Sequence, residues 1–288
     1  MQMTKRQHYL PQFYLDNFTN SSGKLWVYDR LEGRIFASSP RDIGCENYLY
    51  ETRWEDANPK LGEFVLPNQI ENKFAEQEGK YSKLLQNIAR ICDNPQNKRA
   101  LICNKDEKET LASFVSNILL RNPWSMKQAD LDCVTDGIMD VEEIKAIDMM
   151  LRLMEFGGTE SLVKFSSKRV WLDESFEGSM QQESTKDLRG LKYCFIKTER
   201  EQFVTSSFPV LHGIDETTVT EEKMIYFPLN PYIALLYGNS LPHKVWNRIG
   251  VFPEDEIDFW NKQYFKLEIE QVRFIYAKEK SVLEKIVK

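Results

Sequence analysis

A long helical pattern runs through residues 68–93, which read NQIENKFAEQEGKYSKLLQNIARICD. Asn68, followed three residues later by Glu71, has the pattern of a capping box at the start of a helix. After this start, apolar side chains recur three, four or seven residues apart, at Ile70, Phe74, Tyr81, Leu85, Ile88 and Cys92. This spacing places them on one face of an α-helix, so the segment predicts a long helix packed by that face.

Two further helices are predicted after this segment. Asn104 with Glu107 repeats the capping-box pattern. The helix that it starts should end near Asn122, because Pro123 disfavours helical geometry in the residue before it. A third helix is expected over Val141–Glu155. The middle of the chain is therefore predicted to be helical.

Strand patterns lie on both sides of the helices. Lys24–Asp29 and Arg34–Ala37, with Gly33 between them, predict a β-hairpin. The later segments expected to form strands of one sheet are Leu191–Lys197, Gln202–Thr205, Lys223–Phe227 and Tyr232–Tyr237, with a final strand at Val272–Ala277 after a helix over Glu254–Glu268. The predicted class is α+β: an N-terminal β-hairpin element, central helices, and a C-terminal, mostly antiparallel sheet with flanking helices.

Residues 173–190 are polar, charged and punctuated by glycine, and are expected to form a loop. This loop is the predicted boundary between an N-terminal hairpin and helical region, 1–172, and a C-terminal α+β region, 191–288. The two regions are expected to form one compact unit. No apolar run approaches the roughly 18 residues of a membrane helix, and no signal peptide is evident. A soluble, cytoplasmic protein without a membrane partner is therefore expected.

Charge, cysteines and motifs exclude several classes of function. The chain has 38 Lys and Arg against 44 Asp and Glu, a net charge of −6, which argues against a protein that coats DNA but not against a nuclease with a local basic groove. The 5 cysteines are widely spaced, so they are expected to be reduced and not to form a disulfide framework or zinc ribbon. There is no Walker A loop, G-x-G-x-x-G, H-E-x-x-H or G-x-S-x-G pattern, so no metal or cofactor is assigned.

His8 is the first candidate catalytic residue. Histidine is the natural general base at neutral pH, and Gln12 and Tyr14 are candidate binding residues that could orient its ring. The aromatic residues that follow His8 are expected to be buried. Their burial should direct the His8 side chain into a pocket between the N-terminal helix, the first hairpin and the central helices. The alternative is a structural histidine that ties the N-terminus to the core.

Glu78 and Arg121 are the other candidate catalytic residues. Each lies beside the apolar stripe of its predicted helix, and Asn117, a candidate binding residue, precedes Arg121 by four positions and shares its face. A carboxylate beside an apolar face needs a partner, so the two residues are expected to pair between adjacent helices. The pair could be purely structural, or it could line a polar pocket in which Arg121 holds a phosphate or carboxylate.

The opening segment, His8-Tyr9-Leu10-Pro11-Gln12-Phe13-Tyr14-Leu15-Asp16-Asn17-Phe18, resembles the start of a mostly bacterial family, domain-of-unknown-function family 4238. Members of that family begin His-Tyr-x-Pro-x-x-Tyr-Leu-x-x-Phe. Later segments are similar too: Arg121-Asn122-Pro123, 205–209 (TSSFP) and 227–231 (FPLNP). The resemblance implies a fold unit and candidate positions but no reaction. Ser207 stands where relatives usually carry Asp, so an activity that needs this carboxylate would be lost or use another residue.

Two functions from different classes follow. The first is a hydrolase or nuclease-like effector, of toxin or antiviral type, that acts on nucleic acid or a nucleotide in a local pocket. It requires His8, Glu78 and Arg121 to converge on one concave site. The alternative is a non-catalytic binding or partner-recognition module with a protein partner, which the acidic surface, the missing motifs and Ser207 favour.

Overall fold

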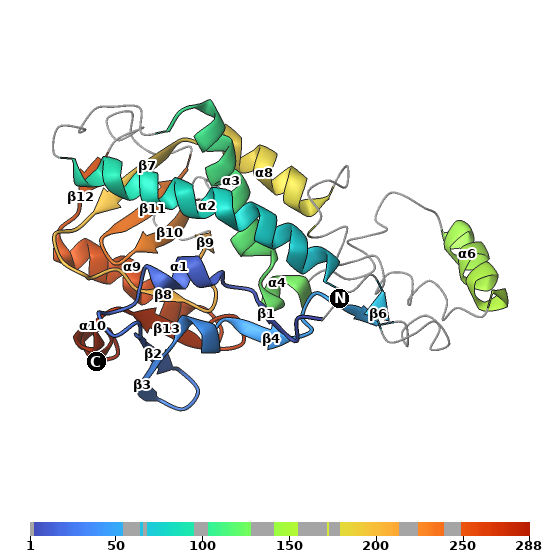
Figure 1. Cartoon of the computed structure of the whole chain (residues 1–288), viewed down its shortest axis with the longest axis horizontal. Helices are drawn as coiled ribbons and strands as arrows, with labels where there is room; N and C mark the ends of the chain where they lie inside the picture. The colour runs from blue at the N-terminus through green and yellow to red at the C-terminus, as the bar shows by residue number, and fades with distance from the viewer. Residues whose placement is uncertain are drawn as a thin grey trace.

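A five-stranded sheet forms the centre of the molecule (Figure 1). The computed structural model describes residues 3–53, 64–65, 68–94, 103–127, 141–154, 172, 179–212, 224–238 and 249–288. The sheet order is β12 (Ile249–Val251), β7 (Tyr193–Lys197), β11 (Ile233–Tyr237), β10 (Ile225–Asn230) and β9 (Leu211–His212). Neighbouring strands are antiparallel except β12 and β7, which are parallel. The predicted α+β class with a mostly antiparallel C-terminal sheet is confirmed.

Helices cover both faces of this sheet (Figure 1). On β11, Ile233, Leu235 and Tyr237 join the core formed with α2 (Gln69–Asp93) and α3 (Lys105–Leu120). The alternate residues Ala234 and Leu236 join a second core, formed with α9 (Glu254–Lys266) and α10 (Lys280–Ile286). Successive strand residues point to opposite faces, so a strand buried on both sides is apolar throughout.

A second sheet joins the two ends of the chain. Its order is β3 (Arg34–Ser38), β2 (Leu25–Asp29), β13 (Phe274–Ala277) and β8 (Thr205–Ser206). The predicted hairpin of β2 and β3 is confirmed, and β13 lies antiparallel between β2 and β8. The expectation that Gln202–Thr205 belongs to the same sheet as Leu191–Lys197 is wrong, because Thr205 pairs with Tyr276 of β13.

Short elements complete the described structure. They are β1 (Arg6–His8), which pairs with β4 (Cys45–Asn47), β5 (Thr52–Arg53) with β6 (Phe64–Val65), α1 (Gln12–Asp16), the 3-10 helix η1 (Pro40–Asp42), α4 (Pro123–Lys127), α6 (Val141–Leu153) and α8 (Met180–Gly190). Of the cysteines, Cys45, Cys92, Cys103 and Cys194 are free thiols, whereas Cys133 lies outside the described residues.

Two local predictions need correction. Residues 180–190 form helix α8 and not a loop, and the side chain of Ser179 caps the helix by accepting from the Gln182 amide at 3.2 Å. Asn68 does not cap α2 with its side chain. Its φ is 63°, and its Oδ1 accepts a hydrogen bond from the Thr4 amide at 2.8 Å. The capping box of Asn104 and Glu107, by contrast, is formed as predicted. The division of the chain at 173–190 stays a prediction.

Arg30 links the second sheet to the end of α9 through side-chain hydrogen bonds. Its Nη1 donates to the carbonyls of Tyr264 and Val272 at 3.2 and 2.6 Å. Its Nη2 donates to those of Phe265 and Leu267 at 3.1 and 3.0 Å. The last carbonyls of a helix have no partner within it, so a cation with a planar fork satisfies them and also suits the helix dipole.

Replacing Arg30 with lysine is therefore expected to lower the free energy of unfolding by about 1–3 kcal/mol, because an ammonium group cannot reach four carbonyls at once. Urea denaturation measures the change. The matched control is Arg34→Lys, since Arg34 is exposed and pairs with exposed Glu32, so the substitution is expected to change stability by about 0.5 kcal/mol or less. Equal effects of the two substitutions would contradict the role given to Arg30.

Candidate functional site

Arg121 ends α3 and is 1% exposed, although it carries a permanent charge. Its Nη1 donates to Glu78 Oε1 at 3.0 Å and to Asn117 Oδ1 at 3.2 Å. Its Nε donates to the Tyr50 hydroxyl at 3.2 Å, and its Nη2 donates to the backbone carbonyl of His8. The structure thus forms the ion pair between α2 and α3 that the sequence predicts, and Asn117 belongs to the same group.

Aromatic rings surround the guanidinium. Its central carbon lies 4.2 Å from the centroid of the Phe74 ring and 5.8 Å from that of Tyr50. A cation over an aromatic face regains part of the electrostatic stabilisation that it loses on leaving water. The Glu78 side chain is 29% exposed, so the carboxylate lies at the edge of the group and Arg121 lies beneath it.

A neighbouring polar network fixes the segment that brings His8 and Tyr50 to Arg121. The Gln7 side chain, which is fully buried, donates to Glu51 Oε1 at 2.6 Å and accepts from the Tyr50 amide at 2.8 Å. Glu51 also accepts from the Asn68 amide at 3.1 Å. Sequence analysis missed Gln7, Tyr50 and Glu51, because they lie in short elements with no periodic pattern.

Glu71 is the other residue that sequence analysis missed as a member of this group. Its pKa is raised to about 7: burial is the main cause, Arg121 opposes the shift, and the nearby Glu78 and Glu51 carboxylates add to it. Its Oε2 is buried with no hydrogen-bond partner among the described residues. A carboxyl group with this pKa exchanges its proton near neutral pH, which is the property of an acid–base residue.

The His8 side chain does not join Arg121 and Glu78. In β1 the side chain of Gln7 points inward, so His8, the next residue, is directed the other way. Its Nε2 lies 3.3 Å from the carbonyl oxygen of Arg41, and burial lowers the pKa of the ring. Only the His8 carbonyl reaches the guanidinium of Arg121, so the expected convergence of three side chains is wrong for His8.

The two predicted binding residues of α1 also lie apart from Arg121. Gln12 is exposed at the start of the helix. Tyr14 is fully buried, and its hydroxyl lies 2.7 Å from Thr205 Oγ1 and donates to the Pro228 carbonyl at 2.7 Å. Burial raises the pKa of Tyr14 far above its ordinary value. Its contacts are those of a core residue that joins α1 to both sheets.

Comparison with known families accounts for nearly the whole chain. The sequence profile of a family described as "Protein of unknown function (DUF4238)" matches residues 6–281. The chain belongs to the DUF4238 family. No curated protein and no solved structure matches it. Membership confirms the predicted family and assigns no reaction.

Ser207, where the resemblance leads us to expect Asp in relatives, is buried beside the second sheet. Its hydroxyl oxygen accepts from the Phe274 amide at 3.2 Å, and its carbonyl accepts from Asn122 Nδ2 at 2.6 Å. Asn122 follows Arg121 directly, so residue 207 is linked to the end of α3. In this chain the position joins elements together: the backbone carbonyl makes the contact with Asn122, and the serine hydroxyl accepts from Phe274 without a charge.

The described part of the chain contains neither a metal-binding cluster nor a membrane-spanning helix. Within these ranges no cluster of three or more His, Cys, Asp or Glu side chains has an arrangement that could hold a metal ion. Among the same residues, no helix combines the length and apolar composition needed to cross a bilayer.

The lowered pKa of His8 leads to a test of its structural role. Since the folded state binds the His8 proton less tightly than the unfolded state, this residue stabilises the fold above about pH 6.5 and the stabilisation is lost as pH falls. His8→Gln is expected to make the midpoint of urea denaturation less sensitive to acid between about pH 6.5 and 5. The control is His212→Gln on β9, where the side chain is exposed. A pH profile unchanged by His8→Gln would contradict this role.

Proposed function

We propose that this member of the DUF4238 family is a non-catalytic binding protein, the alternative of the two functions predicted from the sequence. The supporting observation is the state of Arg121. It is 1% exposed and its guanidinium donates to four acceptors of the protein itself, so a substrate would have to displace Glu78, Asn117, Tyr50 or the His8 carbonyl. Arg121 then stabilises the fold around a binding surface and does not hold a substrate.

A hydrolase, nuclease-like effectors included, is the second candidate, and one observation favours it. Glu71 has a pKa of about 7 and a buried oxygen with no hydrogen-bond partner among the described residues. Glu71 and Glu78 both lie near Arg121, and a pair of neighbouring carboxyl groups is the usual arrangement for general acid–base hydrolysis. In this second candidate function, Glu71 is the acid–base residue in place of His8.

Hydrolysis assays separate the two candidates. The purified chain would be incubated with bis(p-nitrophenyl) phosphate, single-stranded RNA and DNA, with and without divalent cations. If the chain is a non-catalytic binding protein, any turnover in these assays is expected to be the same in the wild type and in Glu71→Gln. Loss of turnover by about 100-fold or more in Glu71→Gln, but not in Glu76→Gln, would overturn the binding function in favour of a hydrolase. Glu76 is the control because it is exposed on the same helix.

A further inference from the structure

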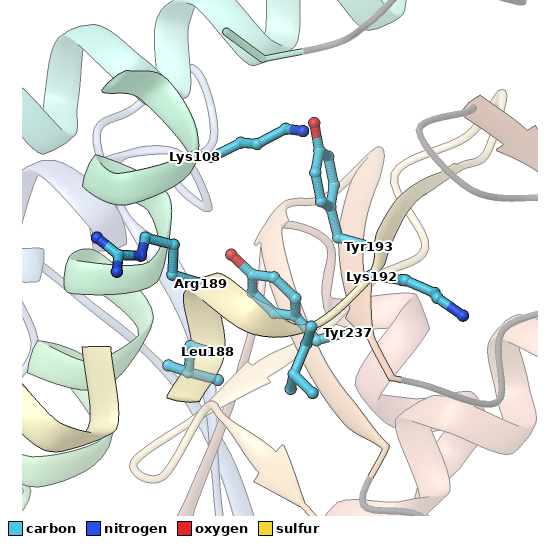
Figure 2. Close-up of a pocket in the computed structure, with 7 residues that line it drawn as sticks. Lys108, Leu188, Arg189, Lys192, Tyr193 and Tyr237 are labelled. Atoms are coloured by element: carbon cyan, nitrogen blue, oxygen red, sulfur yellow. The ribbon is translucent and has the colours of Figure 1, made fainter. Parts of the chain in front are cut away.

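A cavity of about 130 Å³ lies where the start of α3, the end of α8 and the beginning of β7 meet (Figure 2). The described residues that line it are Lys108, Leu188, Arg189, Leu191, Lys192, Tyr193 and Tyr237. Three of these seven residues are cationic and none is acidic, although the chain as a whole is acidic. The cavity therefore differs in charge from the rest of the protein.

Two tyrosines form one wall of this cavity. Tyr193 on β7 is directly opposite Tyr237 on β11, and residues opposite each other in an antiparallel pair share a face of the sheet. Their ring centroids are 6.0 Å apart in an edge-to-face arrangement, and the residues are 3% and 2% exposed. The sheet therefore fixes the position of both rings.

Lys108 supplies the charge that faces the tyrosines. Figure 2 shows its side chain extending toward Tyr193, whereas the charged ends of Arg189 and Lys192 extend away from the two rings. The Lys108 Nζ lies 5.7 Å from the centroid of the Tyr193 ring. Among the described residues no carboxylate lies within ion-pair distance of Lys108, whereas Arg189 has Glu109 at 3.6 Å.

The Tyr193 hydroxyl is a buried polar group at this position. It is buried and makes no hydrogen bond of normal geometry with a described residue, although the thiol and backbone of Cys103 lie close enough to influence its pKa. Burial raises the pKa of both tyrosines, so both hydroxyls keep their protons at neutral pH. A protonated hydroxyl without a partner is stabilised by any acceptor that enters the cavity.

We propose that this cavity binds a small oxyanion, the phosphate or carboxylate group of a small molecule, through Lys108 and the hydroxyls of Tyr193 and Tyr237. Such a group offers only acceptors and a negative charge, which match two protonated hydroxyls and an ammonium. A cationic ligand would be repelled by the lining residues. The proposal rests on the proposed binding function and gives it a site and a ligand class.

Isothermal titration at constant ionic strength tests the site, with inorganic phosphate and acetate as separate arms and chloride as the reference anion. Saturable binding of at least one oxyanion is expected. The anion that binds more tightly shows whether the site prefers a phosphate or a carboxylate group. Lys108→Gln is expected to weaken binding by about tenfold or more, and Tyr193→Phe or Tyr237→Phe by about three- to tenfold. The tyrosine variants keep the rings and therefore the packing of the sheet.

Matched controls separate the site from general electrostatics. Lys186→Gln removes the same charge from an exposed position on α8, where Lys186 pairs with Glu183, and Tyr232→Phe removes the hydroxyl of an exposed tyrosine. Neither control is expected to change oxyanion binding. Equal weakening by Lys186→Gln, or no saturable binding in either arm, would overturn the proposal.

Two results distinguish a failure of the proposed oxyanion site from a failure of the proposed binding function. Oxyanion binding that is unchanged by Lys108→Gln and by both tyrosine variants would refute the cavity while leaving a binding protein. Release of p-nitrophenol from p-nitrophenyl phosphate, lost in Lys108→Gln but not in Lys186→Gln, would keep the cavity and refute the non-catalytic function.

Discussion

Replacing Arg121 with methionine is expected to lower the free energy of unfolding by about 3–5 kcal/mol, measured by urea denaturation at neutral pH. The substitution leaves the Glu78 carboxylate, the Tyr50 hydroxyl and the His8 carbonyl without the guanidinium that they contact. It also removes a cation from the face of Phe74. Methionine fills much of the volume, so the loss reports mainly on the polar contacts.

A double-mutant cycle isolates the ion pair within this loss. Glu78→Gln removes the charge of the partner, and because the two groups touch, the combined variant is expected to lose about 1–3 kcal/mol less than the sum of the single variants. The control is Arg152→Met on α6, where an exposed arginine pairs with Asp148 and the expected loss is below about 1 kcal/mol. An Arg121→Met loss in that same small range would contradict the central role of the buried guanidinium.

Glu71→Gln is expected to raise the free energy of unfolding by about 2–3 kcal/mol at about pH 8 and to have little effect at about pH 4.5. The folded pKa of Glu71, about 7, lies above the ordinary value of 4.5, so the folded state binds its proton more tightly than the unfolded state. Stability from this residue is therefore present at low pH and is lost as pH rises from about 4.5 through 7. The neutral amide avoids that loss.

Stability curves of the wild type and Glu71→Gln across this pH range measure the effect, because the other titrating groups cancel in the difference. Glu76→Gln is the control on the same helix, since that side chain is exposed. A difference curve that stays flat between about pH 4.5 and 8 would show that Glu71 titrates as an ordinary carboxyl group.

The features that the sequence predicts correctly follow from local patterns. The capping box of Asn104 and Glu107 forms because its two partners are three residues apart. The pairing of Glu78 with Arg121 could be predicted because each lies beside the apolar stripe of a long helix. Helix α8 was not predicted, because its buried residues, Gln181 and Leu188, form no apolar stripe among the charged ones.

The features that the sequence does not predict depend on contacts between distant segments. Nothing in Phe274–Ala277 indicates that its partners are β2 and β8, since strand pairing depends on the whole topology. The direction of His8 depends on the short strand β1 and its pairing with β4, which local pattern does not show. The cavity beside Tyr193 needs three elements to meet, so its charge is spread over separate parts of the sequence.

The pairing of β2 with β13 has a consequence for synthesis of the chain. Arg273 and Asp29, which form an ion pair beside this pairing, are 244 residues apart. At about 5–20 residues per second, a ribosome needs roughly 12–50 seconds to extend the chain between them. Throughout that interval the edge of β2 that later pairs with β13 is open, and a hairpin alone is at best marginally stable in water. The second sheet is therefore completed only after nearly the whole chain has left the ribosome, and a product that stops before β13 keeps an exposed edge at which copies can associate.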